Sequence, residues 1–506
     1  MTHARIAVHP ANQIGPVRPR LFGAFVEHLG RCVYGGVYEP GHPTATPDGF
    51  RQDVIDLVRE LGSTTVRYPG GNFVSGYRWE DGVGPRDQRP VRLDAAWRSI
   101  ETNEVGVDEF AKWCRLTGQE LMLAVNLGTR GVLDALRLQE YVNFPGGTTL
   151  SDARARHGSP EPYGVKMWCL GNEMDGPWQL GHMSADDYGK IAARTASAMR
   201  QFDSDLELVV CGSSGMDMPT FGEWERVVLD HCYELVDFIS CHAYYQIRDG
   251  DLATFMASAL GLERFISTVA DTADLVKQKK RSDKTLNISL DEWNIWYLDE
   301  HEQKGQGAWT QAPHCLEDTY TAADAVVLGS LLIAILKHAD RVTSASLAQL
   351  VNAIAPIRTE PGGPAWRQTT FHPFAATSRL ARGLALEARV ECAAYANETY
   401  GDVPFVDAAV THDADAGRSA VFAVNRDPEN SLSVVVDVSL LGAAAVEEAM
   451  SLGAADDPFA ANSADRPDRV VPAPNDTARL AADGALEVVL PPLSWTAVAL
   501  AGGRRR

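Results

Sequence analysis

The chain has 506 residues, of which 45% are apolar and 22% are charged, so it is long enough for two globular domains and its composition excludes a largely disordered protein. Its 46 lysines and arginines against 67 aspartates and glutamates give a net charge of −21, which argues against nucleic acid and anionic membranes as partners. A neutral or cationic small molecule is the favoured substrate.

The N-terminal segment predicts a short strand rather than a targeting signal. Residues 1–18 lack the apolar core of a secretory signal, Ile6 and Val8 share a face, and no helical pattern precedes Pro16. We expect this segment to join the C-terminal domain as an extra strand. The eight cysteines form no C-x-x-C pair, which favours buried thiols in a reducing compartment. We therefore predict a cytoplasmic protein.

Residues 19–380 repeat one theme, in which a short β-rich run with a polar end is followed by a loop and a helical pattern. The helical patterns over residues 54–61 and 110–117 stop before Gly62 and Gly118, and Ser184 is placed to cap a third helix over residues 188–202. Eight such alternations predict an α/β fold, a (β/α)₈ TIM barrel enlarged by insertions. The eight runs are LFGAFVEH, STTVRYPGGN, ELMLAVNLG, VKMWCLGNE, ELVVCGSSG, DFISCHAYY, LNISLDEWN and SASLAQLVN, with polar ends near residues 27, 67, 126, 173, 213, 242, 292 and 349.

The end of the barrel region and the C-terminal part have different patterns. The longest apolar run, residues 325–336, is shorter than the ~20 residues that cross a bilayer and predicts a buried helix. Residues 381–506 alternate between apolar and polar positions without long helical patterns, which predicts an antiparallel, jelly-roll-like β-sandwich. Within it, residues 454–474 are rich in Asp, Ala and Pro and predict a surface loop.

Two glutamates close opposite strands of the predicted barrel. Glu173 ends the fourth run and Glu292 ends the seventh, so both are expected at the barrel mouth, where catalytic groups of this fold lie. Hydrolysis of a glycosidic bond needs one carboxylic acid to protonate the leaving oxygen and a second carboxylate to meet the developing oxocarbenium ion. The pair therefore predicts a glycosidase, and a retaining one if the carboxyl groups lie ~5–5.5 Å apart. Arg67, from the second run, is the cation expected to keep Glu292 charged.

The motifs along the whole chain resemble those of the α-L-arabinofuranosidases of glycoside hydrolase family 51. The segments that carry the resemblance are FGAFVEHLGRCVYGGVYEP, VRYPGGNFVSGYRWEDGVGP, WRSIETNEVGVDEF, WCLGNEMDGPWQLGH, HAYYQIRDGD, DEWNIWY and LAQLVNAIAPI. The resemblance implies an exo-acting enzyme that releases α-L-arabinofuranosyl units from arabinan or arabinoxylan fragments, with Glu173 as acid/base and Glu292 as nucleophile. It implies a homohexamer as well. We expect neither a cofactor nor a bound metal.

The resemblance and the strand ends together predict the sugar-binding residues. The positions that match the family's furanose contacts are Glu27, Asn72, Asn172, Tyr244 and Gln349. His242 is expected either to touch the sugar or to form an interior hydrogen bond. Loops after the strands carry Trp97, Trp178 and Trp296, which are expected either to stack on sugar faces or to pack in the core. Residues 302–314 are long enough to form a lid over the aglycone side.

Four other functions fit the sequence less well than this one. A metal-dependent barrel hydrolase would use Glu27, His28, His242 and Glu292, but the H-x-H pair common at the first strand of such enzymes is missing. A serine hydrolase is disfavoured because CGSSGMD lacks the G-x-S-x-G spacing. A carbohydrate-binding protein has no use for two opposed glutamates. A related barrel glycosidase that acts on xylosides or β-glucans is the closest alternative.

Overall fold

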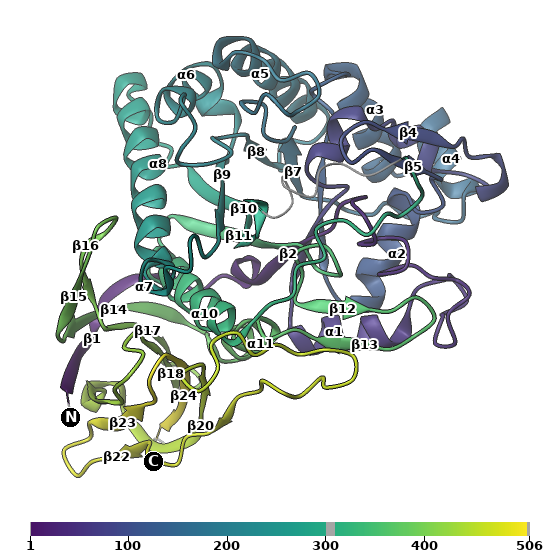
Figure 1. The fold of residues 1–506 in the computed structure, drawn as a ribbon. Coiled ribbons are helices and arrows are strands. Elements are labelled where there is room, and N and C mark those ends of the chain that lie inside the picture. The colour runs from purple at the N-terminus through teal and green to yellow at the C-terminus, as the bar shows by residue number, and fades with distance from the viewer. Residues whose placement is uncertain (1, 300–308, 503–506) are drawn as a thin grey trace.

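Eight parallel strands form a closed barrel in the computed structural model, which describes residues 2–299 and 309–502 (Figure 1). Each strand coincides with one of the eight predicted runs, although β10 ends one residue after its run and β11 begins two residues before its run, so the TIM barrel prediction is confirmed. Around the barrel the strands follow chain order, and β11 closes the ring by pairing with β2. The strands are β2 (Gly23–Phe25), β3 (Thr65–Tyr68), β6 (Glu120–Ala124), β7 (Met167–Leu170), β8 (Glu207–Val210), β9 (Phe238–Tyr245), β10 (Asn287–Ile295) and β11 (Val342–Ala348).

Three helices around the barrel carry the predicted end signals. Gly62 and Gly118 end α1 (Gln52–Leu61) and α2 (Val107–Thr117) in the left-handed conformation, at φ of 72° and 76°, which glycine adopts without strain. Ser184 caps α5 (Ala185–Phe202), and its side chain accepts the backbone N–H of Asp187. The others are α3 (Val132–Asn143), α4 (Thr149–Arg156), α6 (Glu223–Cys232), α7 (Leu252–Met256), α8 (Ser258–Lys280), α10 (Ala322–Lys337) and α11 (Phe371–Leu380).

The C-terminal strands form a second, largely antiparallel sheet. Its ten strands are hydrogen-bonded in the single order β21-β20-β24-β18-β17-β14-β1-β19-β23-β22, and apolar side chains from both halves of this order share one core. The N-terminal strand lies in the middle, antiparallel to β14 and parallel to β19. The strands are β1 (Thr2–Pro16), β14 (Leu384–Glu391), β17 (Val406–Asp413), β18 (Arg418–Asn425), β19 (Leu432–Asp437), β20 (Ala443–Gly453), β21 (Ala473–Pro474), β22 (Arg479–Leu480), β23 (Leu486–Leu490) and β24 (Ser494–Gly502).

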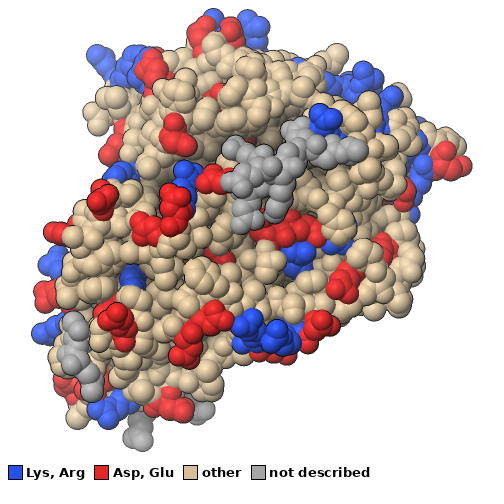
Figure 2. Space-filling view, in the orientation of Figure 1, with Lys and Arg blue, Asp and Glu red and all other residues tan. Residues whose placement is uncertain are grey.

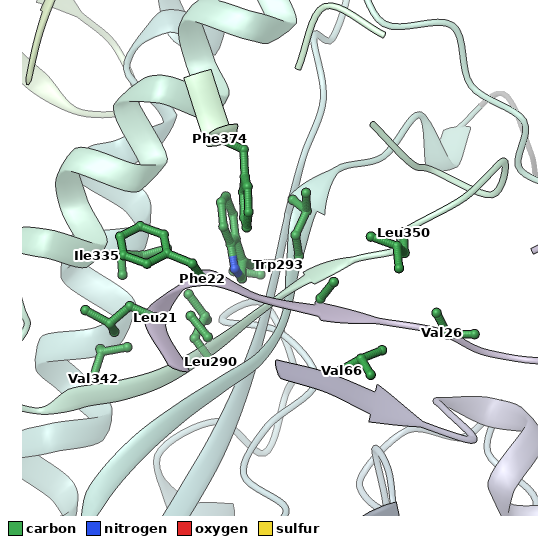
Figure 3. Close-up of a cluster of buried hydrophobic side chains, with 14 of the residues drawn as sticks. Leu21, Phe22, Val26, Val66, Leu290, Trp293, Ile335, Val342, Leu350 and Phe374 are labelled. Atoms are coloured by element: carbon green, nitrogen blue, oxygen red, sulfur yellow. The ribbon is translucent and has the colours of Figure 1, made fainter. Parts of the chain in front are cut away.

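The apolar helix α10 lies between the barrel and this sheet (Figure 1). Residues 322–336 are all buried because the helix has neighbours on both sides, which confirms the predicted buried helix. Ile335 packs with Phe22, Trp293 and Phe374 in the apolar cluster of Figure 3. On the sheet side the contact is close, since a Cβ added at Gly329 would lie 2.2 Å from the Trp495 ring.

The predicted surface loop over residues 454–474 has a structural role that the sequence did not reveal. Its residues are mostly exposed, but Ala460 and Asn462 are buried. The carbonyl oxygens of Pro458 and Ala460 accept the backbone N–H groups of Ala323 and Ala322 at the start of α10. These contacts satisfy donors that a helix start leaves free, so the loop caps the helix.

The surface and the cysteines fit the composition. Acidic and basic side chains are interspersed on the face shown in Figure 2, so the negative net charge forms no single patch there. All eight cysteines are free, six of them buried, while Cys315 and Cys392 are partly exposed. No described helix is long and apolar enough to cross a membrane.

Candidate active site

Glu173 and Glu292 come together at the mouth of the barrel. Glu173 follows β7, and Glu292 lies in β10, three strands further round the ring. A carboxyl oxygen of each lies within 4.8 Å of the other. This separation is close to the ~5–5.5 Å of retaining glycosidases and shorter than the ~6.5–9.5 Å that inverting enzymes need for an intervening water.

A β-bulge in β10 places two adjacent carboxylates in this site. Neighbouring residues of a regular strand face opposite sides of the sheet. The pairing of β10 with β9 shifts register between Ser289 and Glu292, so Asp291 and Glu292 both contact the same cluster, and both are buried. Asp291 was not among the residues predicted from the sequence. Its position next to Glu292 was the available signal, but a regular strand would have pointed it away.

Arg67 and Tyr244 hold the two oxygens of Glu292. The Arg67 guanidinium donates to Glu292 Oε1 at 2.7 Å, and the Tyr244 hydroxyl donates to Oε2 at 2.7 Å. Arg67 is fully buried and also donates to Asn172 Oδ1 at 2.6 Å. Burial raises the pKa of Glu292 above its ordinary value, and the charges of His242 and Arg67 limit that rise. The expected contact with Arg67 is therefore present, although it does not bring the pKa below the ordinary value.

His242 lies between three carboxylates. Its Nδ1 is 2.8 Å from Glu173 Oε1 and 3.5 Å from Glu292 Oε2, and its Nε2 is 2.8 Å from Asp291 Oδ1. Burial would lower the pKa of His242, but the charges of Glu292 and Asp291 outweigh burial and hold it well above the ordinary value. For Asp291, burial is likewise outweighed, by Arg67 and His242, and its pKa lies below the ordinary value. His242 is thus a cation that forms interior hydrogen bonds, one of its two predicted roles, and contact with the sugar stays a prediction.

The catalytic cluster carries one more negative charge than positive charges, so it can bind one proton. Three carboxylates (Glu173, Asp291 and Glu292) face two cations (Arg67 and His242). Because uncompensated charge is costly in a buried site, one added proton gives the favoured neutral state. A single proton on three carboxylates allows one group to act as an acid while another remains ionised.

Glu173 has a strained backbone and two hydrogen-bond donors. Its φ of 44° lies in the left-handed region, which a non-glycine residue occupies at a cost of about 1–3 kcal/mol. His242 contacts Oε1, and the Trp178 indole Nε1 donates to Oε2 at 2.7 Å. Trp178 is 52% exposed, so core packing, one of its two predicted roles, is excluded.

Glu27 anchors a second group of predicted residues. The Trp97 indole donates to its Oε1 at 2.7 Å, and the backbone N–H of Phe73 donates to the same oxygen at 2.8 Å. Gln349 exchanges two contacts with Glu27, since its side chain accepts the Glu27 backbone N–H at 3.1 Å and donates to Oε2 at 3.3 Å. Burial raises the pKa of Glu27 to about 8, against the lowering effect of the two N–H donors on Oε1.

The remaining predicted residues lie around the catalytic pair. The Asn172 amide contacts Asn72 Oδ1 at 3.5 Å, and it contacts Gln179 Oε1, which the sequence analysis missed, at the same distance. Trp296 meets the Tyr244 ring edge-on at 5.0 Å and is partly buried. Most of the proposed lid, residues 302–308, lies outside the described residues. Trp309, at the next position, is 39% exposed.

The metal site considered from the sequence does not form. His28 contacts Glu101 and the Tyr68 hydroxyl, each at 2.8 Å, and is not part of the catalytic cluster. Within the described part of the chain, the group with metal-like geometry is Glu173, His242 and Glu292. Both ring nitrogens of that histidine already contact carboxylates, and Arg67 contacts Glu292. This donor set fits proton transfer better than it fits a divalent cation. The TIM barrel and the two opposed glutamates at its mouth, Glu173 and Glu292, together define a glycoside hydrolase.

Comparison with known proteins identifies the family. Two family models match, the α-L-arabinofuranosidase 1 domain over residues 57–251 and the α-L-arabinofuranosidase C-terminal domain over residues 291–494. An intracellular exo-α-(1→5)-L-arabinofuranosidase from Streptomyces lividans is 56% identical over 502 residues, covering 98% of this chain and 75% of the relative. An exo-α-(1→6)-L-arabinofuranosidase from Bifidobacterium longum is 54% identical over 509 residues, covering 98% and 97%. The solved structure of a family 51 α-L-arabinofuranosidase from B. longum has a TM-score of 0.95 at 51% identity, covering 99% of this chain and all of that one. This chain belongs to the α-L-arabinofuranosidases of glycoside hydrolase family 51.

Proposed function

We propose that this exo-α-L-arabinofuranosidase works by double displacement with retention, with Glu292 as nucleophile and Glu173 as acid and then base. The observation that carries the proposal is the approach of the two carboxyl groups to within 4.8 Å, with no room between them for an attacking water on the far face of the sugar. The different surroundings of the two groups support the assignment. Glu292 accepts two charge-stabilising bonds deep in the site, whereas Glu173 is the more exposed of the pair.

In the first half-reaction, Glu292 attacks the anomeric carbon while the bond from that carbon to the leaving oxygen breaks. Glu173 delivers its proton to the departing oxygen. Arg67 and Tyr244 fix both oxygens of Glu292, so the attacking lone pair is oriented before the substrate arrives. The product of this step is a glycosyl ester of Glu292.

In the second half-reaction, Glu173 takes a proton from water, and the water oxygen attacks the anomeric carbon as the bond to Glu292 breaks. Esterification has removed the negative charge of Glu292, and the His242 cation remains 2.8 Å from Glu173. The loss of the charge on Glu292 and the nearby His242 cation both favour the ionised form of Glu173 that a general base requires. The proton that Glu173 gains restores its acid form.

The substrate proposed is a short arabinose-containing oligosaccharide from arabinan or arabinoxylan, held by Glu27, Asn72, Asn172, Tyr244 and Gln349. Relatives named as intracellular enzymes support action inside the cell on imported fragments. Those names differ in linkage, since the S. lividans enzyme is named for α-(1→5) bonds and one B. longum enzyme for α-(1→6) bonds. The hexamer stays a prediction, and a solution mass of six times 55.0 kDa would support it.

Proton NMR of the first product formed tests the mechanism. Retention predicts that α-L-arabinofuranose appears before mutarotation, whereas β-L-arabinofuranose as the initial product would refute double displacement. A panel of α-(1→2), α-(1→3), α-(1→5) and α-(1→6) linked arabinosides, with xylosides and β-glucosides as controls, then defines the substrate. Faster cleavage of the pyranoside controls would refute the proposed sugar specificity.

A further inference from the structure

Both carboxylate oxygens of Glu173 are occupied by nitrogen donors. His242 Nδ1 lies 2.8 Å from Oε1, and the Trp178 indole donates to Oε2 at 2.7 Å. An indole N–H can only donate, so the lone pair of Oε2 that faces Trp178 cannot carry a proton while this contact exists. The arrangement therefore fits the ionised form of Glu173.

The oxygen that Trp178 occupies is the one that the leaving group needs. The His242 side chain is 3% exposed, so Oε1 faces the closed interior of the barrel. Trp178 is 52% exposed, so Oε2 faces the side that is open to solvent. An aglycone that enters from solvent must place its glycosidic oxygen near Oε2 to receive a proton. The same space cannot hold the indole N–H.

We propose that Trp178 is a positioning residue whose indole competes with the aglycone for Oε2 of Glu173. With the site empty, the indole N–H stabilises the ionised form of Glu173. When an aglycone enters, its glycosidic oxygen displaces the indole, and Oε2 takes up a proton from solvent and delivers it to that oxygen. In the second step the attacking water occupies the same place and gives its proton to Oε2. This inference rests on the proposed acid/base role of Glu173.

The local backbone allows this displacement without a larger rearrangement. Two tight turns follow Glu173. The Gly176 N–H bonds to the Glu173 carbonyl at 2.9 Å, and the Gln179 N–H bonds to the Gly176 carbonyl at 3.0 Å, so Trp178 lies within the second turn and its own N–H and carbonyl do not close either turn. The indole ring lies against Gly176, where an added Cβ would be 2.5 Å from the ring. The φ of Gly176 is outside the left-handed region, so alanine fits the backbone there and would push only the ring.

The test compares leaving groups in Trp178→Phe, which keeps an aromatic ring but loses the donor. The value of kcat/KM reports the steps up to cleavage of the glycosidic bond. We expect kcat/KM to rise by up to about tenfold for aryl arabinofuranosides with poor leaving groups, the size of one charge-assisted hydrogen bond. Substrates with good leaving groups need little acid help and should change by less than about twofold.

The pH profile gives a readout that a purely structural role would not move. Loss of a donor to the ionised Glu173 favours its protonated form, so the alkaline limb of kcat/KM should move to higher pH. Gly176→Ala should move that limb in the same direction, because it displaces the ring without removing it. As a matched control, Trp97→Phe removes an indole donor from Glu27 instead, and it should change kcat/KM by the same factor for good and poor leaving groups.

Two results would overturn the proposal. One is an alkaline limb that stays unmoved in both Trp178→Phe and Gly176→Ala. The other is an equal fall in kcat/KM for good and poor leaving groups, which would make Trp178 a sugar-binding surface only. Failure of the acid/base assignment is separable, because Glu173→Ala would then lose activity by the same factor for every leaving group.

Discussion

Replacement of Arg67 by methionine probes the electrostatics of the catalytic cluster most strongly. Its guanidinium is the buried cation nearest to Glu292, at 2.7 Å, and it also lies 3.7 Å from Asp291. Removal of one partner from a buried ion pair costs about 3–5 kcal/mol, because the remaining charge stays buried without compensation. We expect Arg67→Met to lower the free energy of unfolding at pH 8 by about this amount. The remaining cation, His242, then faces all three carboxylates.

The pH dependence of this loss follows from the direction of the shifts. Arg67 and His242 hold the pKa of Asp291 below its ordinary value, so the stability that Asp291 contributes is present above that value and is lost as the pH falls through the folded-state pKa. Without Arg67, both neighbouring carboxylates bind protons at higher pH, and protonation relieves the unpaired charge. The gap between the wild type and Arg67→Met in urea unfolding should therefore be larger at pH 8 than at pH 5. In the pH profile of activity, the acid limb of kcat/KM should move to higher pH, because Glu292 stays protonated to a higher pH.

Arg20 provides a matched control for Arg67. It pairs with Glu120 and Glu207 at the N-terminal ends of β6 and β8, and its side chain is 21% exposed. Ion pairs with this much exposure contribute about 1 kcal/mol or less, so Arg20→Met should lower stability slightly and leave the pH profile unchanged. Equal urea midpoints for Arg67→Met and the wild type, or an acid limb that does not move, would refute the reasoning.

Two further substitutions test the acid/base and the packing between barrel and sheet. Glu173→Ala should reduce kcat/KM strongly for poor leaving groups and little for good ones, because acid assistance matters least when the leaving oxygen is already stable. A uniform loss across a series of aryl arabinofuranosides would contradict the acid/base role of Glu173. Gly329→Ala should destabilise the folded state by about 1–3 kcal/mol, because the added methyl group overpacks against Trp495. The melting temperature should fall, while activity at 25 °C stays normal. An unchanged melting temperature would contradict the close contact.

The sequence predicted the features that depend on regular patterns. The eight strands alternate with helices whose ends carry ordinary capping signals, so the barrel and its order could be derived. Because all strands of such a barrel point the same way, polar residues at their ends had to meet at one face. This is why Glu173, Glu292 and Arg67 could be named from the strand ends, whereas Tyr244 was named from the resemblance to family 51.

The features that the sequence did not predict depend on local irregularity and on tertiary contacts. Asp291 joins the site through a bulge, which breaks the alternation on which strand patterns rest. Trp178 was expected either to stack on a sugar face or to pack in the core, and its bond to Glu173 depends on a side-chain rotation that no spacing reveals. The loop around Ala460 has a polar, exposed composition, so its capping of α10 follows only from the packing of the sheet against the barrel.

The central claim is that Glu292 forms the bond to the sugar, and Glu292→Ala with added azide tests it most directly. The variant should lose turnover of an activated aryl arabinofuranoside, and azide should restore part of it by occupying the space of the lost carboxylate and attacking the anomeric carbon. The account predicts that the product is a β-L-arabinofuranosyl azide, of inverted configuration. Ordinary hydrolysis by Glu292→Ala without azide, or an azide product of retained configuration, would contradict the account.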